Sequence, residues 1–205
     1  MDPFTRSFLM LFVLLNPFIM TTYLEDLVKE MTFRDFAGQL IRAGVISFGV
    51  FVLFAWGGDR VFENVLQIRF FAFLIFGGLT FLIIGIRLIS GLSPGGVGRR
   101  PDANGAAASI AMPFLVGPGT ISASVLAGSR LPLPQATIAI GLALTAALAA
   151  ILVLKRVHDL LRTHNEPLLH RYTDVAGRVT ALFTGSFAID MILRGFEGWI
   201  AFLRT

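Results

Sequence analysis

The sequence has no cysteine among its 205 residues and few charged side chains. The absence of thiols excludes disulfide bonds, thiolate metal sites and cysteine nucleophiles. Only 15% of the residues are charged, where soluble domains carry about a quarter, and 55% are hydrophobic. Together with a mean hydropathy of +0.77, this composition excludes a water-soluble globular domain and predicts an integral membrane protein.

Dense clusters of basic residues are also absent, although the pI of the sequence is about 10.3. The 17 lysines and arginines are scattered among loops and the ends of apolar stretches. No basic groove interleaved with aromatic side chains can be traced, so we expect no nucleic-acid partner. We interpret the positive charge as a signal for orientation in the membrane.

Six apolar stretches are long enough to cross about 30 Å of hydrocarbon as helices. They cover residues 4–27, 40–56, 70–90, 106–126, 136–154 and 175–194. The first stretch has one arginine, an internal proline and no small-residue cleavage site, which distinguishes it from a signal peptide. The sequence therefore predicts an all-α membrane protein with six transmembrane helices.

Lysine and arginine favour the cytoplasmic side of a membrane, and here they are distributed unevenly. Eleven lie in or beside the loops after spans one, three and five, whereas six lie on the other side together with both termini. The eleven are Lys29, Arg34, Arg42, Arg87, Arg99, Arg100, Lys155, Arg156, Arg162, Arg171 and Arg178, and the six are Arg6, Arg60, Arg69, Arg130, Arg194 and Arg204. This imbalance predicts that both termini lie on the non-cytoplasmic side.

Residues 91–105 are rich in glycine and proline and predict a flexible linker. The linker separates a first three-span repeat, residues 1–90, from a second three-span repeat, residues 106–205. Because three is an odd number, the two halves begin on opposite sides of the membrane. They would then be inverted repeats, an architecture of many secondary transporters.

The first span of each half contains a predicted helix break. Pro17 follows Asn16 in one half, and Pro118 follows Gly117 in the other. Proline removes a backbone donor and clashes with the preceding turn, so such a break persists in hydrocarbon where it lines a cavity. Asn or Gly before proline is also typical of the cap and first turn of a new helix. Each break lies about 12 residues, or about 18 Å, into its span, which brings two half-helix N-termini together near the midplane.

Helix N-termini carry partial positive charge and unpaired N–H groups, which favour an anion or the carboxylate of a zwitterion. The predicted substrate-binding residues are those of the two breaks and the small hydroxyls that follow them: Asn16, Pro17, Thr21, Thr22, Gly117, Pro118, Gly119, Thr120 and Ser122. Ordinary kinks, with hydroxyls bonded to their own helix backbone, are the structural alternative.

Few other residues carry chemistry. Asp190 is the one acidic residue well inside a predicted span, and Arg194 follows it by four residues, so a local ion pair and a coupling role both stay open. His158, His164 and His170 recur at intervals of six, which does not align imidazoles on one helix face. We expect a solvated loop there and no metal site. Without a plausible nucleophile and base pair, we predict no catalytic residues and no cofactor.

Three sequence motifs support a resemblance to a known family. They are residues 14–18 with Asn16 and Pro17, residues 111–121 (Ala-Met-Pro-Phe-Leu-Val-Gly-Pro-Gly-Thr-Ile) and residues 188–195. In these motifs the chain resembles the MarC family of bacterial integral membrane proteins, along essentially its whole length. The resemblance implies a six-span protein of the bacterial inner (plasma) membrane, related to LysE-type exporters. Some members are regarded as transporters of small neutral amino acids such as glycine and alanine.

The chain departs from this family at several positions. Members usually have an amide where this chain has Asp190, and often an acid near Arg194. Many also continue the first break with a glycine and a second proline, whereas Phe18, Ile19 and Met20 follow it here. These departures bear on coupling and on the shape of the pocket.

Our leading hypothesis is a secondary transporter of small neutral amino acids or similar zwitterions that works by alternating access. Its partners would be a small-molecule substrate and membrane lipid. Two alternatives stay open: a channel for small solutes or anions, which can be built from the same paired half-helices, and a structural or regulatory subunit that transports nothing. The sequence leaves open the substrate, the direction of transport, the coupling ion and the oligomeric state, a homo-oligomer included.

Overall fold

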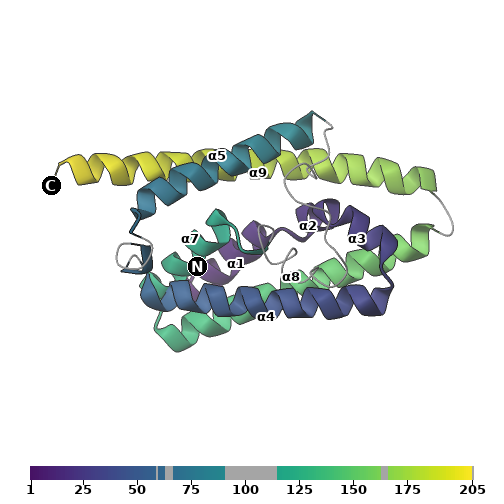
Figure 1. Cartoon of the computed structure of the whole chain (residues 1–205), viewed down its shortest axis with the longest axis horizontal. Helices are drawn as coiled ribbons and strands as arrows, with labels where there is room; N and C mark the ends of the chain where they lie inside the picture. The colour runs from purple at the N-terminus through teal and green to yellow at the C-terminus, as the bar shows by residue number, and fades with distance from the viewer. Residues whose placement is uncertain (59, 63–66, 91–114, 163–165, 205) are drawn as a thin grey trace.

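A computed structural model of the chain describes residues 1–58, 60–62, 67–90, 115–162 and 166–204. The regular secondary structure of these residues is helical, with no strand among them, which confirms the all-α prediction. Figure 1 shows the helices, which are α1 (Pro3–Leu15), α2 (Pro17–Tyr23), α3 (Glu25–Glu30), α4 (Phe33–Gly57), α5 (Phe70–Ile89), α7 (Pro118–Arg130), α8 (Leu133–Arg162) and α9 (Glu166–Leu203).

Three of these helices are long and apolar enough to cross a membrane: α4, α5 and α8. They contain the predicted spans 40–56, 70–90 and 136–154, apart from the last residue of the second. Helix α8 has 30 residues and is about 45 Å long, so it exceeds the hydrocarbon thickness. Helix α1 is apolar but has only 13 residues, too few to cross alone.

The first predicted span is a broken rod. Helix α1 ends at Leu15, α2 begins at Pro17, and a second interruption at Leu24 separates α2 from α3. The predicted break at Asn16 and Pro17 is therefore confirmed. In the second half, α7 begins at Pro118, which confirms the helix start there. Residues 91–114, which include the predicted linker, lie outside the described residues.

The segment after span five differs from the prediction. We expected a solvated loop from His158 to His170, but α8 continues to Arg162 and α9 begins at Glu166. His158 therefore lies on a helix, with a side chain that is only 16% exposed, and His170 lies on α9, while His164 falls outside the described residues. The physical reason is the position of Pro167, which stands in the first turn of α9, where a missing N–H breaks no helical hydrogen bond.

Helices α5 and α9 lie side by side along the upper edge of Figure 1, and the other helices lie below them. Glycines permit the close approach of this pair. A Cβ atom on Gly78 would lie 2.7 Å from the carbonyl oxygen of Ala188, and one on Gly195 would lie 3.0 Å from that of Phe71. Small residues at such contacts are the usual means of packing helices tightly in a membrane.

The lower group surrounds the main core. Its buried side chains come mostly from α4, α7 and α8, with further ones from α1, and they include Leu11, Phe36, Phe51, Ile121 and Ile151. The outer faces of the helices carry exposed apolar side chains instead, including Ile41, Val45, Ile83, Leu142 and Leu182. An apolar outer surface of this extent is expected of a protein whose surroundings are lipid.

Candidate functional site

Asn16 forms the first break by adopting a left-handed backbone conformation, with φ of 33° and ψ of 86°. Asparagine is one of the few residue types that visit this region readily. Its N–H donates to the Phe12 carbonyl at 3.2 Å, and its own carbonyl accepts the N–H of Met20 at 3.1 Å. Asn16 therefore ends α1 and starts α2 within a single residue.

Gly117 and Thr120 form the helix start at the position of the second predicted break. Gly117 is extended and precedes Pro118, the first residue of α7. The Thr120 hydroxyl accepts the N–H of Gly117 at 3.0 Å and lies 2.8 Å from the carbonyl oxygen of Leu115, to which it can donate. Ser124 in turn donates to the Thr120 carbonyl at 2.7 Å. In this conformation, these two hydroxyls are bonded to the backbone of their own segment.

The two breaks lie close together in the core. A Cβ atom on Gly119 would lie 3.4 Å from Cδ2 of Leu14, two residues before Asn16, and 3.2 Å from the Phe81 ring. On the other side of the break, a Cβ atom on Gly77 of α5 would overlap Pro118. Side chains of the protein therefore pack closely around the start of α7.

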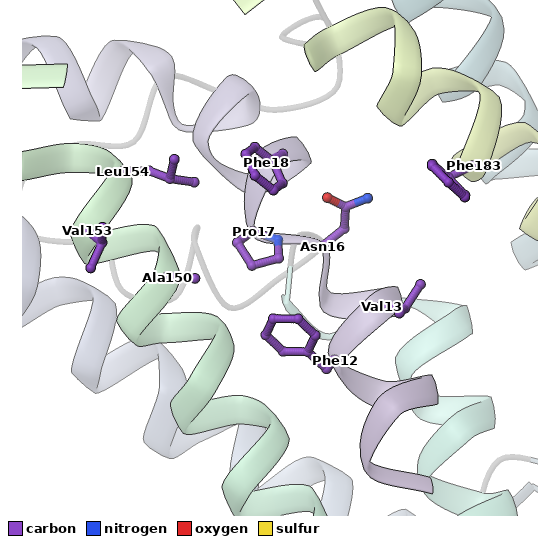
Figure 2. Close-up of a pocket in the computed structure, with 9 residues that line it drawn as sticks. All are labelled: Phe12, Val13, Asn16, Pro17, Phe18, Ala150, Val153, Leu154 and Phe183. Carbon is purple, nitrogen blue, oxygen red and sulfur yellow. The ribbon is translucent and has the colours of Figure 1, made fainter. Parts of the chain in front are cut away.

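A cavity of about 480 Å³ lies at the first break. Figure 2 shows its walls, which come from the end of α1 and the start of α2, from α8 and from α9. Asn16 has the only polar side chain among the nine described lining residues, and Figure 2 shows its amide pointing toward Phe183. The lining consists of Phe12, Val13, Asn16, Pro17, Phe18, Ala150, Val153, Leu154 and Phe183.

The predicted binding residues divide between these places. Asn16 and Pro17 line the cavity, whereas the lining includes none of the residues predicted at the second break, which are Gly117, Pro118, Gly119, Thr120 and Ser122. Thr21 donates its hydroxyl to the Phe18 carbonyl of its own helix at 2.9 Å. The side chain of Thr22 lies outside the described part of the chain. The structure thus brings the two predicted breaks close together, and the cavity at Asn16 is lined by residues of the first.

Most of the residues that line the cavity were not predicted from the sequence. Ala150, Val153 and Leu154 belong to an apolar span in which nothing distinguishes a cavity-facing residue from a lipid-facing one. Phe12 and Val13 lie within one turn of the predicted break, and this proximity is the one signal that could have identified them.

Asp190 and Arg194 form the i,i+4 ion pair that their spacing allows. The Arg194 Nε lies 2.7 Å from the Asp190 Oδ2, and both side chains are about half exposed. Neither residue lines the cavity at Asn16. The local partner of Asp190 is therefore established, and a coupling role stays a prediction.

Comparisons with known proteins agree with the sequence motifs. The family described as MarC family integral membrane protein matches residues 1–200. A UPF0056 membrane protein of Pyrococcus horikoshii is 24% identical over 195 residues, which are 94% of this chain and 92% of the relative. A UPF0056 membrane protein of Aquifex aeolicus is 28% identical over 126 residues, so that the match spans 58% of each chain. No solved structure matches. The chain belongs to the MarC family of integral membrane proteins.

Proposed function

We propose that this protein is a secondary transporter of small neutral amino acids or similar small zwitterions, and that it works by alternating access around the two breaks. The observation that carries the proposal is that two helices start at Pro17 and Pro118, and that the start of the second lies against Leu14, just before the start of the first. A cavity of about 480 Å³ adjoins the first of them, and this volume suits a small ligand.

The pattern of helix packing supports an inverted repeat of six spans. Helix α2, which follows the first break, packs on α8 and α9, and α7, which follows the second break, packs on α4 and α5. If spans one to three correspond to spans four to six, α4 corresponds to α8 and α5 to α9. The α2–α8 contact then corresponds to the α4–α7 contact and the α2–α9 contact to the α5–α7 contact, while the α4–α8 and α5–α9 contacts are their own counterparts. A two-fold axis between the halves produces this exchange.

Contacts at the two ends of the molecule support the six-span topology. Lys155 of α8 bonds to Val28 of α3, so the segments after spans one and five meet at one end. At the other end, Arg69 lies 3.8 Å from the ring centre of Phe202, which joins the start of α5 to the end of α9. Helix α1 begins and α9 ends toward the left of Figure 1. With the charge imbalance, we propose that this left end is the non-cytoplasmic side of a bacterial plasma membrane.

In the proposed mechanism, the amide of Asn16 orients the polar group of the substrate within an otherwise apolar cavity. The start of α7 would complete the site with N–H groups when it separates from Leu14 and Phe81. An alternating-access carrier keeps part of its pathway sealed in each state. The packed second break and the open first break fit one such state.

Flux of radiolabelled glycine or alanine in proteoliposomes tests the proposal. We expect saturable uptake that is faster when the vesicles are preloaded with unlabelled substrate. Asn16→Leu should reduce this uptake at least about tenfold, because a lost charge-assisted hydrogen bond is typically worth about 1.5–3 kcal/mol. The matched control is Gln135→Leu, which removes an exposed amide at the start of α8. Equal flux from Asn16→Leu and the unaltered chain would contradict the site, and flux that does not saturate would favour a channel.

A structural or regulatory subunit is the second candidate, because the second break is filled by side chains of the protein itself. Gly119 faces Leu14, Phe81 and Met191 within 3.6 Å of a Cβ position. A subunit of this kind would co-purify in a stable complex with another membrane protein. It would also transport none of a panel of small amino acids.

A further inference from the structure

Lys155 is buried, although the sequence alone places it among the charges of a cytoplasmic flank. It is 2% exposed. Its Nζ donates to the carbonyl of Val28 and to Oδ1 of Asp159, both at 2.6 Å. The Nδ1 of His158 lies 3.7 Å from the same carboxylate oxygen. A buried ammonium group is tolerated only where such partners compensate its lost hydration.

The bond to Val28 caps the C-terminus of α3. Val28 is among the last four residues of that helix, whose carbonyls have no partner inside the helix and carry partial negative charge. The bond also joins residues 127 positions apart in the chain. Leu24 and Leu27 of the same segment are buried with Val28, so this end of the molecule is sealed beneath α3.

The cavity at Asn16 lies between the same two segments that Lys155 joins. One wall is the start of α2 and another is α8, whose lining residue Leu154 directly precedes Lys155. The α2–α3 segment thus begins at the helix break of Asn16 and is bonded at its far end to Lys155. A movement of this segment away from α8 would widen the cavity, and it would break the bond to Val28.

The corresponding contact of the second half is built differently. There the end of α7 packs on the end of α4, and a Cβ atom on Gly128 would overlap the carbonyl oxygen of Ala55. Backbone packing closes that end, whereas a charged side chain reaches across at the α3 end.

We propose that Lys155 is a latch, meaning that its hydrogen bond to Val28 holds α3 against α8 and that release of this bond widens the cavity at Asn16. Asp159 holds the ammonium group in position. Lys155 lines no part of the cavity, so it acts as a positioning residue. The purpose of the latch rests on the proposed alternating-access function. Whether the bond restrains α3 can be measured without any transport assay.

The absence of cysteine makes the latch directly testable. A single Ala150→Cys reporter in the cavity wall is labelled with a sulfonated maleimide in lipid nanodiscs. Lys155→Met removes the ammonium group and keeps an apolar stem, and we expect it to raise the labelling rate about tenfold. Arg156→Met is the matched control, because it removes a neighbouring charge that is exposed. A Ser129→Cys reporter at the exposed end of α7 should label at the same rate in both variants.

An unchanged rate in Lys155→Met, or an equal acceleration by Arg156→Met, would overturn the latch. If Lys155→Met is not monodisperse, Asp159→Asn replaces it: this variant keeps the bond to Val28 and loses the carboxylate, so labelling should accelerate about threefold. An unchanged rate in that variant would also overturn the proposal. Because the readout is labelling, accelerated labelling without amino acid flux would refute the proposed transport function and leave the latch standing.

Discussion

Asn16 shows how one residue can serve both fold and site. Its left-handed backbone ends α1 and admits Pro17, while its amide is the polar group of the cavity. Thr120 and Ser124 at the second break show the contrary case, because backbone atoms of their own segment bind both hydroxyls. Similar residue types at two similar breaks thus have different roles in this conformation.

At the residue scale, we expect Gly77→Ala to destabilise the protein by about 1–3 kcal/mol, since the added Cβ overlaps Pro118 and forces α5 and α7 apart. The midpoint of thermal unfolding in detergent measures this effect. Gly38→Ala is the control, because a Cβ at that helical position meets nothing within 4 Å. Gly38→Ala should be neutral or slightly stabilising, as alanine is the better helix former. Equal midpoints for the two variants would contradict the packing of α7 against α5.

At the element scale, the position of a proline within a segment, more than the number of prolines, determines where a helix begins. Pro17, Pro118 and Pro167 all stand at the start of a helix, where the missing N–H breaks no helical hydrogen bond. The sequence analysis treated the first two as helix starts and placed Pro167 in a loop. Only the third interpretation was wrong, because α9 extends well beyond the apolar stretch that marks its span.

The start of α7 depends on the Thr120 hydroxyl, and its removal should therefore be costly. We expect Thr120→Val, which has nearly the same shape, to destabilise the protein by about 1–3 kcal/mol, because the buried N–H of Gly117 loses its acceptor. Thr120→Ser keeps the hydroxyl and should recover most of the loss. Thermal unfolding of the three proteins decides the matter, and a serine variant no more stable than the valine variant would count against the cap.

At the scale of the whole molecule, α2 packs on α8 and α9 while α7 packs on α4 and α5, and this exchange fits the proposed inverted repeat of the two halves. In the proposed inverted repeat, a two-fold axis in the membrane plane would bring the helix starts at Pro17 and Pro118 together. The two ends of the molecule nevertheless differ in their closing contacts, Lys155 on Val28 at one and Gly128 on Ala55 at the other. Unequal closing contacts at the two ends fit the proposed alternating-access transporter, in which each state closes one end.

Substrate binding should stabilise the whole fold. A ligand that binds only the folded protein adds about 2.7 kcal/mol at a concentration of 100 Kd, so glycine or alanine should raise the thermal unfolding midpoint in a concentration-dependent way. The Asn16→Leu variant serves as the control and should lose the shift. A midpoint that none of the small neutral amino acids moves would argue against the proposed substrate class.

The sequence by itself determined the features that depend on local chemistry. Membrane insertion follows from the hydrophobic composition, α4, α5 and α8 follow from continuous apolar stretches, and both helix starts follow from proline after a capping residue. The pairing of Asp190 with Arg194 is likewise a matter of helical spacing.

Tertiary structure alone decided which side of each helix faces the interior. In an apolar span all faces of the helix carry similar side chains, so the sequence does not indicate which residues of α8 line the cavity. The burial of Lys155 could not be predicted from the sequence either. Lys155 lies in a charged flank by sequence and becomes an interior group only because α3 folds back against α8 and offers it a carbonyl. Contacts between segments 127 residues apart have no local signature, and the packing of the whole chain creates them.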